Sequence, residues 1–461
     1  SLILSTIFLL IAALETNDFF AKVYKAPVNA ESAIITALIL ALIVPPINGF
    51  HDLIFLGWAA VLAMSSKYII AIGRKHIFNP AAIAVALTAW GIGKSANWWS
   101  GNAWMAPSLI IVCYLIARKI RRGEMLLWFL GTVGGLSLVF GVINGTNLVR
   151  LFSEIILHSS LWFFAGVMLT EPLTSPTTKG WQKIFAIVTG IIYTPQVHLG
   201  GLFFTPETAL MAGNVFAYIV SPKNKLILNL GQKIQTAPDT FDFIFPLSKR
   251  IRYQPGQYME WTLQAEHNDN RGNRRYFTLA SSPTEDNLRI GVKFYEPSSN
   301  FKKTMLLVEN QPIVVSQLAG DFILPKNKNE KLVLIAGGIG VTPFRSMIKY
   351  LSDKQEKRDI VLLFSNKEKE EIVYKDVFDE AEKTTGLKTI YTLTDEEKIS
   401  ADWKGERGRI NEKMIEKAIP DYRERTFYIS GPQTMVKATK DLLRSMEIGE
   451  EKIRTDYFPG F

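Results

Sequence analysis

Cysteine is almost absent from this chain of 461 residues, since Cys113 is the only one. A plant-type iron–sulfur centre needs four cysteine thiolates, a structural zinc usually needs several, and a disulfide needs two. None of these sites can form within one copy of the chain. The sequence has only five histidines, and it predicts no metal site.

Charge is scarce in the first half of the sequence. Residues 1–222 contain 13 Lys and Arg and 8 Asp and Glu, whereas residues 223–461 contain 39 and 35. This contrast predicts a helical transmembrane domain over residues 1–222 and a water-soluble part after it. The net charge of +9 is spread over both halves, so a nucleic-acid partner is not expected.

Nine apolar segments occur in the first half, and several are long enough to cross a hydrocarbon core of about 30 Å. They cover about residues 2–14, 31–48, 52–73, 78–93, 103–120, 124–143, 149–170, 183–204 and 206–220. The sequence therefore predicts a polytopic α-helical membrane domain of about nine helices. The first segment lacks the charged start and small-residue cleavage site of a signal peptide.

Basic residues gather on one side of this predicted domain. With a cytoplasmic soluble half, the cytoplasmic connections hold Lys22, Lys25, Arg74, Lys75, Arg118, Lys119, Arg121, Arg122, Lys179, Lys183, Lys223 and Lys225. The opposite side has only Lys94 and Arg150. The positive-inside bias therefore predicts a protein integral to the plasma (inner) membrane with its soluble half in the cytoplasm.

Two polar stretches, residues 73–80 and 168–176, interrupt the apolar half on the expected cytoplasmic side. Non-helical backbone near a bilayer is tolerated where protein or a polar ligand satisfies it. A cofactor pocket is one interpretation of these stretches. Helix capping by Pro and Asn is the other.

The motifs of the first half resemble the membrane flavin subunits of the Rnf complex and of the sodium-pumping NADH:quinone reductase, over about residues 30–222. The resemblance rests on His76 to Pro80 with Ala81-Ala82, on Thr170 to Pro176, and on Thr205-Pro206-Glu207 leading into Ala212-Gly213-Asn214. That family attaches a flavin through a threonine, which the corresponding loop of residues 100–107 lacks. The resemblance implies a second, noncovalent flavin, FMN or riboflavin, near Asn79 and Thr174.

Haem is the alternative redox group for the membrane half. His51, His76, His158 and His198 lie in or near it. Haem-bearing ferric reductases and NADPH oxidases resemble the plan of this chain, but they carry paired histidines at a fixed spacing on two facing helices. The sequence has no such pair, so a flavin is favoured over haem.

The second half predicts two soluble domains. Short alternating strands indicate an antiparallel β-barrel domain over residues 233–325, with strands at 241–246, 257–263, 274–279, 288–295 and 313–318. Apolar strands separated by helical patterns indicate a parallel α/β domain over residues 326–461, with strands at 332–336, 360–364, 389–393 and 426–430.

Three motifs link these domains to nucleotide chemistry. Gly337-Gly338-Ile339-Gly340 ends the first parallel strand, where glycine lets the backbone approach a phosphate and the next helix offers unpaired N–H groups. Arg275-Tyr276-Phe277-Thr278 lies upstream, and Ser430-Gly431-Pro432 lies downstream. In this order they resemble the ferredoxin-NADP reductase superfamily, over residues 233–461. The resemblance implies an FAD-binding barrel and an NAD(P)-binding α/β domain.

The resemblance also assigns roles around the flavin. Arg275 would neutralise the FAD pyrophosphate as a fixed cationic fork. Phe277 would lie against the isoalloxazine ring, and the Thr278 hydroxyl would bind its hydride-accepting edge. Further cofactor-binding candidates are Ser281 at the end of the same motif, Lys293, and the turn of Ser298 and Ser299.

NAD(P)H would lie across Gly337, Gly338 and Gly340. Thr342, Ser430, Gly431 and Pro432 would lie near the nicotinamide, and Ser430 replaces a cysteine that is frequent in the family. The terminal aromatic Phe461 is the candidate for covering the flavin. Ser365 and Lys367 follow the second parallel strand, where an adenosine 2′-phosphate would lie, and they leave NADH and NADPH both open.

The sequence therefore predicts an enzyme, a membrane-bound NAD(P)H:acceptor flavin oxidoreductase. Cytoplasmic NAD(P)H would reduce FAD, and electrons would then enter or cross the lipid bilayer through the second flavin. The acceptor is a quinone, an outward acceptor or a soluble redox protein. Two alternatives remain: a redox-driven ion pump using Glu154, Lys67 and His158, and a membrane-anchored reductase of a soluble electron-transfer protein.

Overall fold

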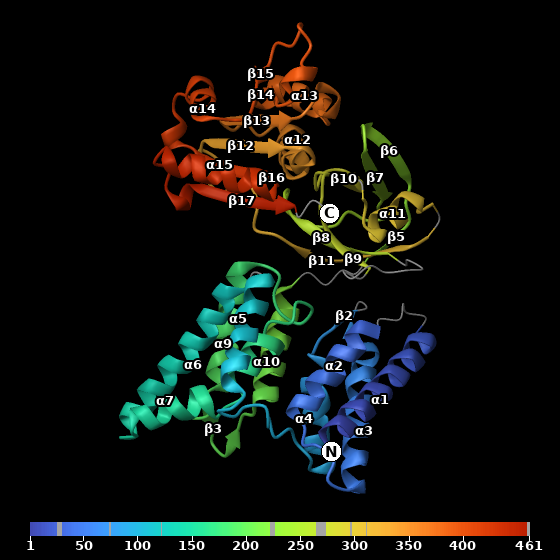
Figure 1. Cartoon of the computed structure of the whole chain (residues 1–461), viewed down its shortest axis with the longest axis vertical. Helices are drawn as coiled ribbons and strands as arrows, with labels where there is room; N and C mark the ends of the chain where they lie inside the picture. Colours follow the sequence, from blue (N-terminus) through green and yellow to red (C-terminus); the bar gives the residue numbers. More distant parts are fainter. Residues whose placement is uncertain are drawn as a thin grey trace. The chain divides into compact units, whose positions relative to one another are not determined.

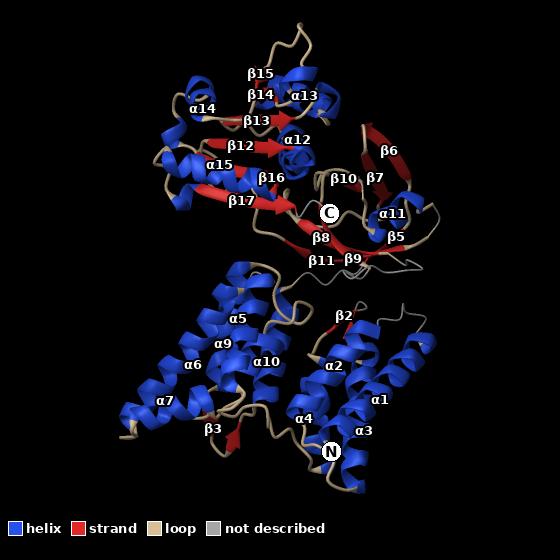
Figure 2. Ribbon diagram, viewed as in Figure 1, coloured by secondary structure: helices blue, strands red, loops and turns tan. Residues whose placement is uncertain are grey.

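The chain forms two compact units, Ser1–Lys225 and Leu226–Phe461. The structure is a computed structural model, and it describes residues 1–24, 30–72, 75–120, 122–221, 226–263, 273–295, 297–309 and 311–458. Figure 1 shows the elements coloured along the chain. Figure 2 shows that helices fill most of the first unit and that the long strands belong to the second.

The first unit contains a helix in each of the nine predicted apolar segments. The helices are α1 (Leu2–Val23), α2 (Ala30–Ile43), α3 (Phe50–Ile69), α4 (Pro80–Ile92), α5 (Ala106–Lys119), α6 (Gly123–Ile143), α7 (Leu148–Leu157), α8 (Leu161–Phe163) with a π-helical turn (Phe164–Met168), α9 (Lys179–Tyr193) and α10 (Pro206–Val220). Two short hairpins join helices, β1 (Ala71–Ile72) with β2 (Lys75–His76) and β3 (His198–Leu199) with β4 (Leu202–Phe203).

Three helices in the described part of the chain, α1, α3 and α6, are long and apolar enough to cross a membrane. The count is four if α7 and Leu161–Met168, which meet at 52°, form one span. Helices α2 and α4 are apolar but shorter. α4 is short because Asn79 caps its start ahead of Pro80 and Gly93 ends it with a φ of +65°. The nine-span domain therefore stays a prediction.

The first unit buries many alanines and several aromatic rings, and it exposes many large apolar side chains. Its core includes alanines of α3 and α4, together with Phe129, Phe164 and Phe185. Large apolar side chains are instead exposed along α1 and α6, such as Ile3 at 75% and Leu127 at 69%. Extensive exposed apolar surface is expected of helices that contact lipid.

The second unit begins with an antiparallel subdomain, here called the barrel subdomain. Its elements are β5 (Leu226–Leu228), β6 (Gln232–Ala237), β7 (Thr240–Pro246), β8 (Tyr258–Thr262), β9 (Arg274–Thr278), β10 (Asn287–Lys293), α11 (Asn300–Leu307) and β11 (Ile313–Ala319). They form two sheets, β10-β7-β6 and β5-β11-β8-β9. In β10 the buried residues alternate, Leu288, Ile290 and Val292, so one face joins the core beside Phe245 and Trp261.

All five strands predicted for the barrel are present, and two more precede them. β5 pairs with β11, and β6 pairs with β7. The second unit therefore starts earlier than the predicted residue 233. β5 has only three residues, which is too short for a periodic pattern to be recognised.

The remainder of the second unit is a parallel α/β subdomain. Its elements are β12 (Leu332–Gly337), α12 (Thr342–Asp353), β13 (Ile360–Asn366), α13 (Lys375–Thr385), β14 (Lys388–Leu393), β15 (Glu406–Arg407), α14 (Glu412–Ala418), β16 (Thr426–Pro432), α15 (Gln433–Ser445) and β17 (Ile453–Phe458). The sheet order is β15-β14-β13-β12-β16-β17, and every pair is parallel. The strand order reverses beside β12, and ligands of such sheets bind outside the carboxyl ends at that point.

Candidate flavin and nucleotide site

Two of the predicted motifs, 337–340 and 430–432, meet at the carboxyl edge of the parallel sheet. β12 and β16 are adjacent, with Ala336 opposite Ser430. Gly337 ends β12, and a 3-10 turn over Gly338–Val341 leads into α12, which begins at Thr342. Residues far apart in the sequence are thus brought to one edge, as the nucleotide prediction requires.

The glycines at this edge allow the two strand ends to approach closely. A Cβ atom on Gly340 would lie 2.5 Å from the Gly431 Cα and 2.6 Å from the Ser430 carbonyl oxygen. A Cβ atom on Gly337 would collide with the Met435 sulfur. Gly338 differs, because its surroundings are open and its φ is +52°. The loop therefore presents bare backbone on its open side, which suits a phosphate-bearing ligand.

Polar groups remain unpartnered at the same edge. The Ser430 hydroxyl is fully buried and has no hydrogen-bond partner among the described residues. The same is true of both amide atoms of Asn366, the last residue of β13. Buried groups of this kind are rare unless a ligand or water serves them. Asn366 was missed by the sequence reasoning, which considered its neighbours Ser365 and Lys367 for the adenosine side.

The predicted flavin motif lies on β9 and contacts α11. The Phe277 and Phe301 ring centroids are 5.9 Å apart, and the Arg275 guanidinium lies 5.2 Å from the Phe301 ring centroid. The Arg275 Nη1 also donates to the Arg274 carbonyl at 2.7 Å. An aromatic surface and a fixed cation therefore lie together, as a flavin ring and its pyrophosphate require.

Lys302 adds a second cation that the sequence reasoning missed. It lies in the first turn of α11, where the Ser299 side chain caps the helix by accepting from the Lys302 amide. Burial and the nearby Arg275 guanidinium lower the pKa of Lys302 to about 8. Two adjacent cations, one of them buried, favour an anion between them, so the residues present fit a pyrophosphate. Lys302 closely follows the predicted Ser298-Ser299 turn. This closeness in sequence was the only sign that Lys302 could belong to the flavin site.

Thr278 and Ser281 hold the end of the flavin motif in place. Thr278 is buried at the end of β9 opposite Tyr258. The Ser281 hydroxyl accepts from the Arg289 amide at 3.0 Å, and the Ser281 carbonyl accepts from Ser346 of α12 at 2.6 Å. Ser281 therefore joins the motif to the α/β subdomain. Its direct contact with a cofactor stays a prediction.

The other predicted flavin residues have protein partners. Lys293 forms an ion pair with Glu371 at 2.6 Å, which links β10 to the α/β subdomain. The Ser298 hydroxyl donates to the Tyr295 carbonyl at 2.5 Å. Pyrophosphate support by these two residues stays a prediction. Phe461, proposed to cover the flavin, lies outside the described residues.

The polar stretches of the first unit also converge. Glu171 accepts from the Asn79 amide at 2.7 Å and from the Thr174 hydroxyl at 2.9 Å. Asn214 of α10 accepts from the Asn79 backbone and donates to the Thr174 carbonyl. The His76 Nε2 lies 4.0 Å from Glu171. We call Asn79, Glu171, Thr174 and Asn214 the membrane-unit cluster.

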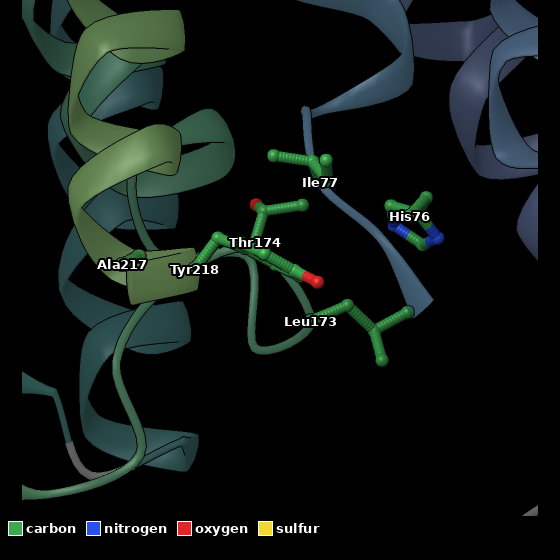
Figure 3. Close-up of a pocket in the computed structure, with 6 residues that line it drawn as sticks. All are labelled: His76, Ile77, Leu173, Thr174, Ala217 and Tyr218. Carbon is green, nitrogen blue, oxygen red and sulfur yellow. The ribbon is translucent and has the colours of Figure 1, made fainter. Parts of the chain in front are cut away.

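A small cavity adjoins this cluster. Figure 3 shows its lining, with His76 on one side, Ala217 and Tyr218 on the other, and Leu173 and Thr174 between them. The lining leaves almost no room even for a water-sized sphere, whereas typical ligand pockets have volumes of roughly 300–1,000 Å³. The donors of Asn79 and Thr174 are also engaged with Glu171. A flavin does not fit this cavity in the present conformation.

The three polar residues of the ion-pump alternative have separate neighbours. Glu154 pairs with Arg150 on the exposed face of α7 at 3.0 Å. Lys67 of α3 donates to Thr36 at 3.1 Å and to Ser32 at 3.0 Å, both in α2. His158 follows the end of α7. Within the described ranges, no three His, Cys, Asp or Glu side chains gather as metal ligands.

Comparison with known proteins agrees with the geometry of the second unit. Residues 334–441 match the oxidoreductase NAD-binding domain family. The chain is 29% identical over 208 residues to a flavohemoprotein of Bacillus subtilis, covering 45% of this chain and 51% of that protein. It is 28% identical over 210 residues to the glycine betaine monooxygenase reductase subunit of Chromohalobacter salexigens, covering 45% and 56%.

A solved structure with a similar chain trace is the flavohem-like FAD/NAD-binding domain of nitric oxide dioxygenase from Vibrio cholerae. It has 19% identity and a TM-score of 0.45, and the match covers 50% of this chain and 98% of that one. The chain spans about half the length of the curated relatives named above. The matches with the curated relatives amount to about half of this chain.

These findings confirm the enzyme class predicted for the second unit. It is an oxidoreductase module, since the matching family and the similar proteins are oxidoreductases. The family match agrees with nucleotide binding by the parallel subdomain, which lies in the same unit as an antiparallel one. The resemblance of the first unit to Rnf and NADH:quinone reductase subunits stays a prediction.

Proposed function

We propose that the chain is a membrane-bound NAD(P)H-dependent FAD oxidoreductase that passes electrons into or across the membrane. The observation that carries this proposal is the meeting of Gly340 with Ser430 and Gly431, next to a buried Ser430 hydroxyl without a partner. At this edge the glycine backbone carries no side chains, and a polar hydroxyl lies beside it. The edge is also where the strand order reverses, which is the place where sheets of this kind bind dinucleotides.

Bound FAD would supply the ability to accept two electrons together and release them singly, which side chains cannot do. The Arg275 and Lys302 cations would hold its pyrophosphate, and Phe277 would lie against its ring. The Thr278 hydroxyl would orient the ring edge, while Thr342, Ser430 and Pro432 would position the nicotinamide of NAD(P)H. The buried position of Thr278, Thr342 and Ser430 keeps water away from these groups.

The test is purification of the full chain in detergent, followed by cofactor extraction and nucleotide oxidation. We expect about one FAD bound to the second unit and oxidation of NADH or NADPH with ferricyanide as electron acceptor. A colourless protein that does not oxidise either nucleotide after addition of FAD would contradict the proposal.

The membrane location rests on α1, α3 and α6, on their exposed apolar side chains, and on the bias of basic residues. We propose insertion in the plasma (inner) membrane with the second unit in the cytoplasm. Protease treatment of sealed, right-side-out vesicles should leave the second unit intact. Cleavage of the second unit before the vesicles are lysed would indicate the opposite orientation.

The family resemblance also implies a second flavin, FMN or riboflavin, at the membrane-unit cluster, which the cavity does not accommodate in its present conformation. Its support is the convergence of Asn79, Thr174 and Asn214, which the family resemblance singled out. Binding there requires the side chains that fill the cavity, such as Leu173 and Tyr218, to move. Extraction should give about two flavins per full chain. A ratio of one would remove the second flavin from the proposal.

A membrane-anchored reductase of a soluble protein is the second candidate. It is favoured by the similarity to a monooxygenase reductase subunit. Inverted vesicles distinguish the two candidates. Reduction of a quinone inside the bilayer supports the first, whereas reduction of an added flavodoxin-like protein alone supports the second.

A further inference from the structure

The barrel and α/β subdomains meet through a buried polar contact at Tyr374. The Tyr374 hydroxyl donates to the Asp242 carboxylate at 2.6 Å. Asp242 lies in β7 with no exposed surface, and its other oxygen accepts from Arg289 at 3.1 Å. Arg345 of α12 lies 5.4 Å from the Tyr374 ring centroid. We call Asp242, Arg289, Arg345 and Tyr374 the interdomain latch.

Arg345 strengthens the same contact from the α/β side. Its guanidinium forms two hydrogen bonds with Glu285 of the barrel subdomain, at 2.8 and 3.0 Å. It also donates to the Ala280 carbonyl at 2.7 Å, directly after the flavin motif. A buried, two-pronged arginine contact of this kind fixes orientation as well as distance.

The backbone at Tyr374 is strained, which indicates that the contact holds it. Tyr374 has a φ of +58°, in the left-handed region. A bulky residue there costs on the order of 1 kcal/mol, and such strain persists only where surrounding contacts fix it. Tyr374 immediately precedes α13. The hydroxyl contact therefore also fixes where α13 begins.

The latch lies next to the nucleotide loop. Asp242 pairs across the sheet with Gly291 of β10. A Cβ atom on Gly291 would collide with the Tyr374 hydroxyl, and it would lie 3.0 Å from side-chain carbons of Ile339 and Thr342. One glycine of the barrel thus contacts both the latch and the loop that would carry the nicotinamide.

We propose that Tyr374 is a positioning residue, which through Asp242 fixes the nucleotide loop against the flavin-binding barrel. This inference rests on the proposed function, because the distance it sets is the one over which hydride leaves NAD(P)H for FAD. Hydride transfer is sensitive to such placement, since an error of about 1 Å in reacting groups can cost on the order of a hundredfold in rate.

The experiment compares Tyr374→Phe, Asp242→Ala and their double variant in the full-length protein in detergent. Tyr391→Phe is the matched control, because the buried Tyr391 hydroxyl of β14 has no hydrogen-bond partner among the described residues. Stopped-flow absorbance measures flavin reduction at saturating NAD(P)H. Hydrogen exchange of residues 372–378 is measured on the flavin-free protein.

We expect each single variant to slow flavin reduction by about tenfold to a hundredfold, with KM and flavin content near those of the control. The double variant should be no slower than the worse single one, because both remove the same bond. Exchange over residues 372–378 should accelerate in the variants and not in Tyr391→Phe.

Flavin reduction within twofold of the control in both single variants would overturn the positioning role. Loss of flavin and of thermal stability together would also overturn it, since that pattern is a purely structural effect. If the unaltered protein fails to oxidise NAD(P)H, the proposed function fails instead. The exchange measurement then still decides whether the hydroxyl joins the two subdomains.

Discussion

The two predicted cofactor sites differ in whether their polar groups already have partners. At the edge of the parallel sheet, the Ser430 hydroxyl and the Asn366 amide are buried and unpartnered among the described residues. In the membrane-unit cluster, Glu171 accepts from both Asn79 and Thr174. The first site keeps unused hydrogen-bonding capacity, whereas the second uses its capacity internally.

This difference has an energetic meaning. A buried polar group without a partner costs roughly 1–3 kcal/mol, so a protein retains one mainly where a ligand or water supplies the missing bond. The sheet-edge residues therefore have hydrogen-bonding groups left for a ligand or water to satisfy. The membrane-unit cluster stabilises helix ends, and a ligand there competes with bonds that already exist. The following variants test this comparison.

Gly340→Ala should have the largest effect, because the new methyl group would meet backbone atoms of Ser430 and Gly431. Backbone cannot move aside as a side chain can, so the two strand ends must separate. We expect the rate of NAD(P)H oxidation to fall about a hundredfold, with flavin content retained. Steady-state kinetics and flavin absorbance measure both quantities.

Gly386→Ala, at the end of α13 and outside the predicted site, is the control for this variant. Its methyl group meets open space, but its φ of +81° costs a non-glycine residue about 1–2 kcal/mol. It should lower stability modestly and slow nucleotide oxidation far less than Gly340→Ala. Equal losses in the two variants would mean that close approach of the strand ends is not what forms the site.

Arg275→Ala should release the flavin. A charged hydrogen bond to a phosphate contributes about 1.5–3 kcal/mol, so we expect roughly tenfold to a hundredfold weaker FAD binding. Arg274→Ala is the matched control, because Arg274 instead lies 3.6 Å from Glu260 in a partly exposed ion pair. Titration of flavin-free protein with FAD gives both affinities. Similar affinities for the two variants would contradict the assignment of Arg275.

Glu171→Ala tests the other side of the comparison. It leaves the Asn79 amide and the Thr174 hydroxyl without their acceptor, which should lower the unfolding free energy of the first unit by about 1–3 kcal/mol. Glu124→Ala is the control, because Glu124 pairs with Lys179 and Lys183 on the surface, where a pair contributes about 1 kcal/mol or less. Thermal unfolding in detergent compares the two.

The flavin ratio adds a second result. If the Asn79 and Thr174 donors hold a flavin, Asn79→Ala should lose about one flavin per chain, while Glu124→Ala should not. An unchanged ratio with lowered stability would assign the cluster to the packing of helix ends alone.

Most of the second unit could be predicted from sequence because its strands follow strong patterns. β10 alternates buried and half-buried residues, and every residue of β12 is buried. β5, β6, β15 and β17 were missed for different reasons. β5 and β15 are too short to show periodicity, and β6 has only one buried residue. β17 alternates charged residues at the edge of the sheet.

The candidate site could be predicted from the sequence only where its residues are close together in the chain. Gly337 to Gly340 and Arg275 to Thr278 are continuous in sequence, so their chemistry could be recognised. Lys302, Asn366 and Tyr374 could not, because their importance comes from contacts between elements distant in sequence. Asp242 and Tyr374 are an example, since they are joined only when the barrel and the α/β subdomain pack together.

A variant of Lys302 should have the smallest effect on stability. It tests whether the flavin site has a positive charge that an anion can pair with. In the flavin-free protein, burial and the nearby Arg275 lower the pKa of Lys302 from the usual 10.5 to about 8. Its Nζ donates to the Lys293 carbonyl at 2.7 Å, and no ion pair between Lys302 and a carboxylate occurs within the described ranges. Below pH 8 the amine is charged in both folded and unfolded chains, so the folded state bears the part of the burial cost that this hydrogen bond does not offset.

Between about pH 8 and 10.5 the unfolded chain holds this proton more tightly, so the stability of the flavin-free protein should rise with pH through that window. The hydrogen bond to the Lys293 carbonyl and solvent screening limit the gain to about 1 kcal/mol. Lys302→Met should lack it, and urea unfolding at several pH values measures the difference between the two proteins. A difference that is constant with pH would show that the pKa of Lys302 is not lowered in the folded protein. Bound FAD should diminish the pH dependence, because its pyrophosphate would favour the charged amine.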